Sequence, residues 1–357
     1  MDQEPEVESS DGGESEDATR GSDADRATAV IDRAEHLVGE GRTDEAEAIY
    51  HAAFESGLHG VFVAYADLLT AQPSRWIDAE QLYRRGIEAG IVEAHNELGN
   101  LLIDMGRQRE AEAQYRAGLE LGDLLVLRNL GQLLTELGHF AEAENYLRGA
   151  ISCDDPEAYR DRGDLYAKVG LYHNAERDYQ TAIAAGVENV NLDYGNLLCE
   201  ELQRPREAEA QFLLAIEAGE PQAYHSLALL YAEMGRPGDA EKQYRSAIRE
   251  NVEEALTDFG IFLAGQGRFG EAEEAFEEAI AGGDEGAHDV YAGLLLELNR
   301  DEGALEHLLR AVELDPSEPG NAALLAYAAG RRGWRLDPED EAEAEEAEAA
   351  GEGEEHA

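Results

Sequence analysis

An alanine returns along the chain with a step of 32 or 33 residues, nine times between residues 46 and 304. A large apolar side chain stands four residues after each alanine, and a small residue stands seven after it. Because offsets of four and seven lie on one face of an α-helix, the pattern predicts an amphipathic helix in each repeat, with a small-large-small stripe along it. The alanines are Ala46, Ala79, Ala111, Ala143, Ala175, Ala208, Ala240, Ala272 and Ala304; the large residues are Tyr50, Tyr83, Tyr115, Leu147, Tyr179, Phe212, Tyr244, Phe276 and Leu308.

A second helix is predicted before this one in each repeat, because another small residue, such as Gly99, stands twelve or thirteen positions before the alanine. Most repeats then have a glycine five positions before the alanine, such as Gly106, and the ninth repeat has Asn299. Glycine and asparagine accept the left-handed backbone that ends a helix, so the first helix should stop there. The second and sixth repeats carry one extra turn residue, each with a proline, Pro73 or Pro205.

The stretch NELGNLLIDMGRQREAEAQYRAGLE, residues 96–120, resembles a tetratricopeptide repeat in its small-residue, turn-glycine, alanine and aromatic spacing. The resemblance spans about residues 27–334. It implies an all-α, right-handed superhelical solenoid of about nine helix-turn-helix repeats, with a concave groove lined by the first helix of each. The links between repeats, such as EAGIVEAHNELG, are shorter than is usual in that family and are similar to those of Sel1-like repeats. One longer link, LDPSEPG, leads to a predicted C-terminal capping helix at residues 321–329.

The two ends of the chain differ from this array. Residues 1–26 and 335–357 are rich in carboxylates and poor in large apolar side chains, so they cannot bury enough surface to offset the entropy of ordering. We expect both to be disordered acidic tails. The predicted repeats are 27–57, 58–90, 91–122, 123–154, 155–186, 187–219, 220–251, 252–283 and 284–315, with the cap at 316–334.

Composition narrows the choice of partner. The chain has 79 acidic and 28 basic residues, a formal net charge of −51, and its only lysines are Lys168 and Lys242. Such a surface repels nucleic acid and anionic membranes, and no stretch approaches the roughly 20 apolar residues that span a bilayer. Lysine scarcity fits either adaptation to high salt or a GC-rich genome, and the size of the acid excess favours the salt interpretation. We therefore expect a cytoplasmic protein with neither nucleic-acid nor membrane partners.

The sequence shows no constellation that would carry catalysis. It contains no GxGxxG, phosphate-loop, HExxH, GxSxG or CxxC pattern, and its ten histidines have no partner at metal-ligand spacing. Cys153 and Cys199 form neither a disulfide framework nor a metal motif. Glutamate pairs on helices are typical of a solvated face. We therefore expect no enzyme activity, no cofactor and no metal.

The resemblance also implies a candidate binding site. In peptide-binding members of the family, groove-facing positions of the first helices carry asparagines and basic residues that grip a peptide backbone or its carboxylates. Asparagine offers both donor and acceptor, and guanidinium binds a carboxylate through two parallel bonds. Alternatively, asparagine is simply the common family residue, and each arginine pairs with a nearby glutamate. The matching positions are Asn96, Asn100, Arg128, Asn129, Gln132 and Arg160, with Lys168 near the same ridge.

Two functions follow from these observations. The first is a scaffold that binds a peptide or protein segment in the groove. The second is a non-catalytic regulatory or assembly subunit of an enzyme complex. Nucleic-acid binding would need basic groove positions in every repeat, which the acidic array lacks. A hidden catalytic domain has no segment outside the repeats long enough to form it.

Overall fold

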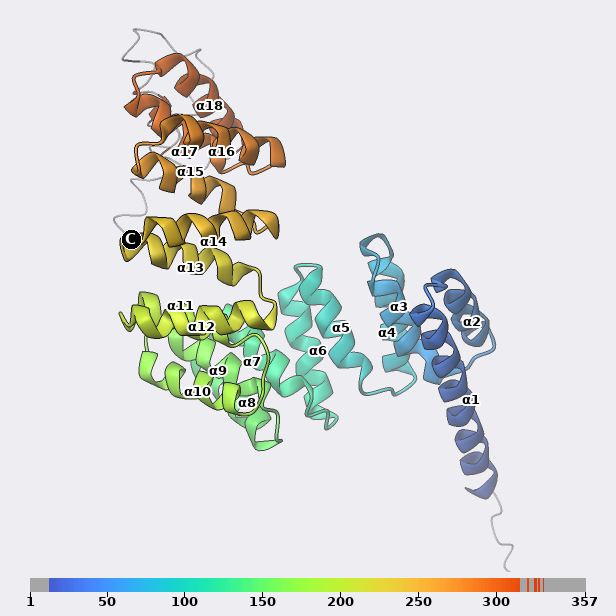
Figure 1. Cartoon of the computed structure of the whole chain (residues 1–357). Coiled ribbons are helices and arrows are strands. Elements are labelled where there is room, and N and C mark those ends of the chain that lie inside the picture. Colours follow the sequence, from blue (N-terminus) through green and yellow to red (C-terminus); the bar gives the residue numbers. More distant parts are fainter. Residues whose placement is uncertain (1–12, 315–319, 321–323, 326, 328–329, 331–357) are drawn as a thin grey trace, which may run out of the picture. The chain divides into compact units, whose positions relative to one another are not determined.

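The structure of the protein is a computed structural model that describes residues 13–314, 320, 324, 325, 327 and 330. Within these residues the chain is entirely helical apart from its turns and links, and no strand occurs. The chain divides into an N-terminal unit, residues 1–187, and a C-terminal unit, residues 188–357. Figure 1 labels the helices of both units.

Eighteen α-helices, α1 to α18, are present in the described part of the chain. In the N-terminal unit they are α1 (Gly13–Gly39), α2 (Thr43–Glu55), α3 (Phe62–Thr70), α4 (Trp76–Glu88), α5 (Ala94–Asp104), α6 (Gln108–Glu120), α7 (Val126–Glu136), α8 (Phe140–Ser152), α9 (Glu157–Lys168) and α10 (Tyr172–Ala184), with short 3-10 helices at η1 (His59–Val61) and η2 (Pro73–Arg75). In the C-terminal unit they are α11 (Asn191–Glu200), α12 (Pro205–Ala218), α13 (Gln222–Glu233), α14 (Pro237–Arg249), α15 (Ala255–Gly265), α16 (Phe269–Gly282), α17 (Ala287–Glu297) and α18 (Asp301–Leu314).

The helices are packed in successive pairs. Each odd-numbered helix packs against the even-numbered helix that follows it, and within a unit each pair also contacts the next pair. These pairs correspond to the nine predicted repeats. The predicted all-α solenoid of helix-turn-helix repeats is thus confirmed in the described part of the chain.

The close approach of paired helices depends on the small residue of the odd helix. A Cβ atom placed on Gly99 of α5 would lie 2.3 Å from Cε1 of Tyr115 on α6, which is far inside van der Waals contact. The Tyr115 ring is only 2 % exposed, and the stripe alanine Ala111 is fully buried. The stripe predicted from the sequence therefore forms the interface between the two helices of a repeat.

The turns also adopt the predicted backbone. Gly106, which follows α5, has φ of 72°, and Asn299, which follows α17, has φ of 57°. Both values lie in the left-handed region that ends a helix. The two longer turns differ from the rest: Pro73 opens the 3-10 helix η2, and Pro205 is the first residue of α12, a position where its missing N–H costs no helical bond.

The described helices begin before the predicted array. Helix α1 begins at Gly13, so residues 13–26, which composition predicts to be disordered, are helical in the structure. Contacts within the helix support this extension, such as the ion pair of Arg26 with Asp23 at 3.0 Å. The first core side chain of α1 is Ala27, where the predicted array starts. The remaining tail residues, 1–12 and 335–357, and most of the predicted cap lie outside the described residues, although Leu325 is described and is buried.

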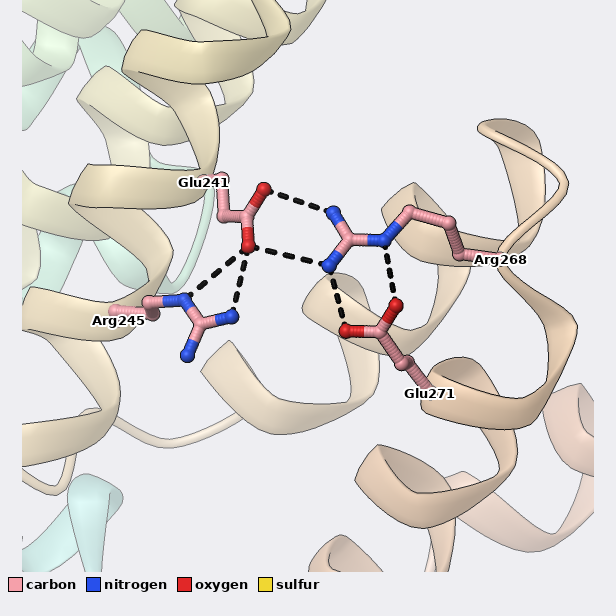
Figure 2. Close-up of polar contacts among 4 residues, drawn as sticks. All are labelled: Glu241, Arg245, Arg268 and Glu271. Atoms are coloured by element: carbon pink, nitrogen blue, oxygen red, sulfur yellow. Dashed lines mark hydrogen bonds and ion pairs between the residues drawn. The ribbon is translucent and has the colours of Figure 1, made fainter.

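A ladder of arginines links consecutive even helices. An arginine four residues before the stripe alanine reaches back 27 or 28 residues to a glutamate on the preceding even helix. Figure 2 shows one such contact, in which Arg268 binds Glu241 of α14 at 2.8 Å and also binds Glu271 at 2.6 Å. Arg245 binds the same Glu241 at 2.7 Å. The other rungs are Arg75–Glu47 at 3.1 Å, Arg107–Glu80 at 2.9 Å, Arg236–Glu209 at 3.0 Å and Arg300–Glu273.

Candidate functional site

The candidate binding residues all lie on three consecutive odd helices of the N-terminal unit. Asn96 and Asn100 are on α5, Arg128, Asn129 and Gln132 are on α7, and Arg160 and Lys168 are on α9. We call this set the odd-helix surface. Residues three or four apart on a helix face the same side, so Asn96 and Asn100 of α5 lie together, as do Asn129 and Gln132 of α7.

Three asparagines of the odd-helix surface form one hydrogen-bond network across two repeats. The side-chain nitrogen of Asn129 donates to the side-chain oxygens of Asn96 at 2.9 Å and Asn100 at 3.0 Å. The Asn96 and Asn100 amides in turn donate to the two carboxylate oxygens of Glu97 at 3.0 and 3.2 Å, and the Tyr115 hydroxyl donates to Asn100 at 2.8 Å. These contacts hold the Asn129 side chain in one orientation.

Arg128 is engaged by carboxylates of the next repeat. Its guanidinium lies 3.3 Å from Asp155 and 2.5 Å from Glu157, at the start of α9, and 3.9 Å from Asp161. A ligand carboxylate would have to compete with these groups for Arg128. In the structure Arg128 thus pairs with nearby acidic residues.

Asp161 lies beneath this cluster and is 7 % exposed. Burial raises the pKa of Asp161 to about 6, although a hydrogen bond with Gln132 and the charges of Arg128 and Arg160 favour its ionised form. Its Oδ2 atom accepts no hydrogen bond within the described residues. Protonation of Asp161 therefore changes the charge beside Gln132 and Arg128 of α7 near pH 6.

Lys168 does not join this cluster. It is the last residue of α9, it is exposed, and it forms no ion pair within the part of the chain that the structure describes. A separate buried ion pair anchors α9 to α10: Arg162 binds Asp178 through bonds of 2.6 and 3.1 Å, and the Asp178 side chain is 1 % exposed. This pair supports α9, the helix that carries Arg160.

A hollow of about 180 Å³ opens beside the asparagine network. Its lining residues are Asn100, Ile103, Asp104, Tyr115, Asn129, Gln132, Leu133 and Glu136. Amide groups beside apolar ones suit a ligand that presents both a main chain and a side chain.

The structure offers no metal site or membrane span in the residues it describes. No group of three or more His, Cys, Asp or Glu side chains there is placed to hold a metal ion. Cys153 is exposed and Cys199 is half-buried, and both are free thiols. None of the described helices is both long enough and apolar enough to cross a bilayer.

A family model described as tetratricopeptide repeat matches the chain over residues 96–158, 225–288 and 257–319. These stretches coincide with helix pairs of the structure in both units. The matched stretches of the chain are tetratricopeptide repeats.

Two solved structures resemble the chain in fold. A tetratricopeptide repeat protein from Parabacteroides merdae is 20 % identical with a TM-score of 0.50, and the match covers 66 % of this chain and 98 % of that chain. A human IFIT1 dimer with PPP-AAAA is 16 % identical with a TM-score of 0.55, covering 95 % of this chain and 86 % of that one. At these identities the likeness concerns the fold alone. No curated protein sequence matches the chain.

Sequence reasoning missed three features of this tetratricopeptide-repeat surface. Glu97 joins the two asparagines of α5, the Tyr115 hydroxyl reaches Asn100 although the ring was assigned only to the core, and Asp161 is a buried charge. Only the tyrosine had a signal in the sequence, because a ring with a hydroxyl at a core position usually needs a polar partner.

Proposed function

We propose that the chain is a non-catalytic protein-interaction scaffold that binds a peptide or protein segment along the odd-helix surface. Its tetratricopeptide repeats support the general role of an interaction scaffold. The observation that carries the location is the orientation of Asn129, whose amide nitrogen is held by Asn96 and Asn100 of the preceding repeat, next to the hollow.

The recognition that this geometry favours is directed at a peptide main chain. The Asn129 nitrogen is already used, and its side-chain oxygen accepts no hydrogen bond from the described residues. The Asn129 oxygen therefore suits a backbone N–H. Gln132 already donates one N–H to Asp161, and its side-chain oxygen and second N–H suit an extended segment. A carboxylate clamp is less favoured because Asp155 and Glu157 occupy Arg128.

The charge of the chain supports a protein partner over nucleic acid. With 79 acidic and 28 basic residues, phosphate backbones are repelled over long distances. Protein segments with a neutral or basic charge approach the chain without this electrostatic repulsion.

Partner capture with site variants tests the proposal. The parent chain and the variants N129A/Q132A and R128E/R160E are each immobilised. Each is then incubated with a native lysate at low and at high salt. We expect N129A/Q132A to lose most of the captured partner, and R128E/R160E to lose part of it because the cluster with Asp155 and Glu157 is broken. The control R109E/R148E reverses two exposed arginines outside the odd-helix surface and should capture as the parent does.

The outcome also separates the two functions. Equal capture by the parent and N129A/Q132A would show that the odd-helix surface is not the binding site. Recovery of one enzyme in a fixed ratio, whose activity falls when this chain is absent, would favour the role of an assembly or regulatory subunit.

A further inference from the structure

Helix α14 differs in charge from the other α-helices in the described part of the chain. It carries Lys242, Arg245 and Arg249 against Asp239 and Glu241, which makes it the one α-helix there with a positive formal charge. Offsets of three and four place the three basic residues along one exposed stripe.

Two of these charges have no acidic partner in the described residues. The Arg249 guanidinium donates to the backbone oxygen of Arg245 at 3.2 Å and to the Ser246 hydroxyl at 2.9 Å, both on its own helix. Lys242 forms no ion pair there either. In a chain with 79 acidic residues, two basic groups without a carboxylate partner on one helix are available to a ligand.

A cleft of about 500 Å³ runs beside this stripe, between α14 and α16 and over α15. Apolar side chains line its base, and the α16 wall carries Glu274 and Glu278, which are exposed and pair with no cation in the described residues. A second hollow of about 580 Å³ adjoins it and shares Ile248 and Leu256. The apolar lining residues of the first cleft are Ile248, Leu256, Phe259, Leu263 and Ala275.

We propose that this cleft, the α14–α16 cleft, is a second docking site, which takes an amphipathic α-helix of a partner protein. The apolar face of that helix packs on Ile248 and Leu256, one flank presents carboxylates to Arg249, and the other flank presents basic residues to Glu274 and Glu278. The proposal concerns the C-terminal unit and is independent of the odd-helix surface.

The dimensions and charges of the cleft favour this occupant. Its walls are helices of 13 and 14 residues, about 20 Å long, which match three to four turns of a partner helix. Opposite charges on the two walls select a helix with opposite flanks and disfavour one whose flanks are both acidic. Arg245 is held in place by Glu241, which the arginine ladder also fixes through Arg268 (Figure 2), so this wall is ordered before a partner arrives.

Three synthetic helical peptides test the proposal by fluorescence anisotropy. The mixed probe has leucines on one face, glutamates on one flank and lysines on the other, with zero net charge. The serine probe replaces its leucines by serine, and the acidic probe has glutamate on both flanks. We expect the mixed probe to bind at least about tenfold more tightly than either of the others. Binding of the serine probe as tight as that of the mixed probe would overturn the apolar contact.

Variants of the full chain locate the binding. L256S should weaken the mixed probe about tenfold through loss of apolar contact, and R249E should weaken it several-fold through repulsion of the glutamate flank. R109E reverses an exposed arginine of α6 and should leave binding within about twofold of the parent. Unchanged binding to L256S and R249E would place the probe elsewhere and overturn the proposal.

A change of specificity gives the sharpest test. E274K/E278K makes both walls basic, so the acidic probe should bind about tenfold more tightly than it does to the parent. E88K/E120K changes the net charge equally, at exposed glutamates of the N-terminal unit, and should produce only a small gain. Equal gains in both variants would mean that net charge alone controls binding, which contradicts the proposal. Loss of partner capture by N129A/Q132A would not affect any of these results.

Discussion

Arg268 connects two repeats by holding Glu241, with its terminal nitrogens 2.8 and 3.3 Å from the two carboxylate oxygens. The Glu241 pKa is lowered, first by the hydrogen bond from Arg268 and then by that from Arg245. The same offset of 27 or 28 residues recurs in the pairs Arg75–Glu47, Arg107–Glu80, Arg236–Glu209 and Arg300–Glu273. At these junctions the turn that starts the even helix therefore also supplies a polar contact to the preceding repeat.

The loss of thermal stability on removing the Arg268–Glu241 contact should depend on salt concentration. R268A is expected to lower the thermal unfolding midpoint slightly in dilute buffer, because Glu241 keeps only Arg245 as a partner. The difference from the parent should shrink as salt is added, since partly exposed charges are screened. Circular dichroism melts at low and high salt measure it. R148A, which removes an exposed arginine without an ion pair in the described residues, is the control and should melt like the parent.

Two helical glycines with different surroundings should respond in opposite ways to substitution by alanine. G99A places a methyl group 2.3 Å from the Tyr115 ring and should lower the free energy of unfolding by about 1–3 kcal/mol. G293A lies in α17 with open space at its Cβ position and should raise it by about 0.5–1 kcal/mol through helix propensity. Urea titrations compare the two. A stable G99A would show that the ring does not pack on this glycine.

The buried ion pair of α9 and α10 predicts a large loss when its basic partner is removed. R162L leaves the Asp178 carboxylate, 1 % exposed, with only the 3.4 Å contact to Arg177. Breaking such a pair should cost about 3–5 kcal/mol of unfolding free energy. R177L removes an arginine whose side chain is 65 % exposed and should cost much less. Similar losses for both variants would contradict the assignment of Arg162 as the main partner.

Asp161 predicts a stability change between acidic and neutral pH. Because burial raises its pKa from 3.8 to about 6, the folded chain binds more protons than the unfolded chain in that window. The contribution of Asp161 to the free energy of unfolding therefore falls as the pH rises through it. D161N abolishes this titration, so its stability relative to the parent should improve by about 2 kcal/mol from pH 4.5 to pH 8. Urea titrations at both pH values measure this. A parent and variant with parallel pH profiles would mean that Asp161 titrates normally.

The repeat pattern determined the architecture because its information is local. The spacing around Ala111 specifies which face of each helix is apolar, and Gly106 specifies where the first helix ends, so sequence alone predicted the helix pairs and their turns. The same spacing predicted that Tyr115 would be buried. An arginine also stands at the turn position in seven of the nine repeats, but a partner in the preceding repeat lies 27 or 28 residues away and could not be assigned from local spacing.

The tertiary structure alone decided how the candidate site residues are used. Asn96, Asn100 and Asn129 share one network only because α5 and α7 lie side by side, and Arg128 turns to Asp155 and Glu157 because the next repeat brings them within 3.3 Å. A long polar side chain can reach several partners, and which one it binds depends on the distances and burial that the packing of neighbouring repeats sets. The sequence therefore determined which residues stand on the odd helices, while the packing of those helices decided which polar groups remain available to a ligand.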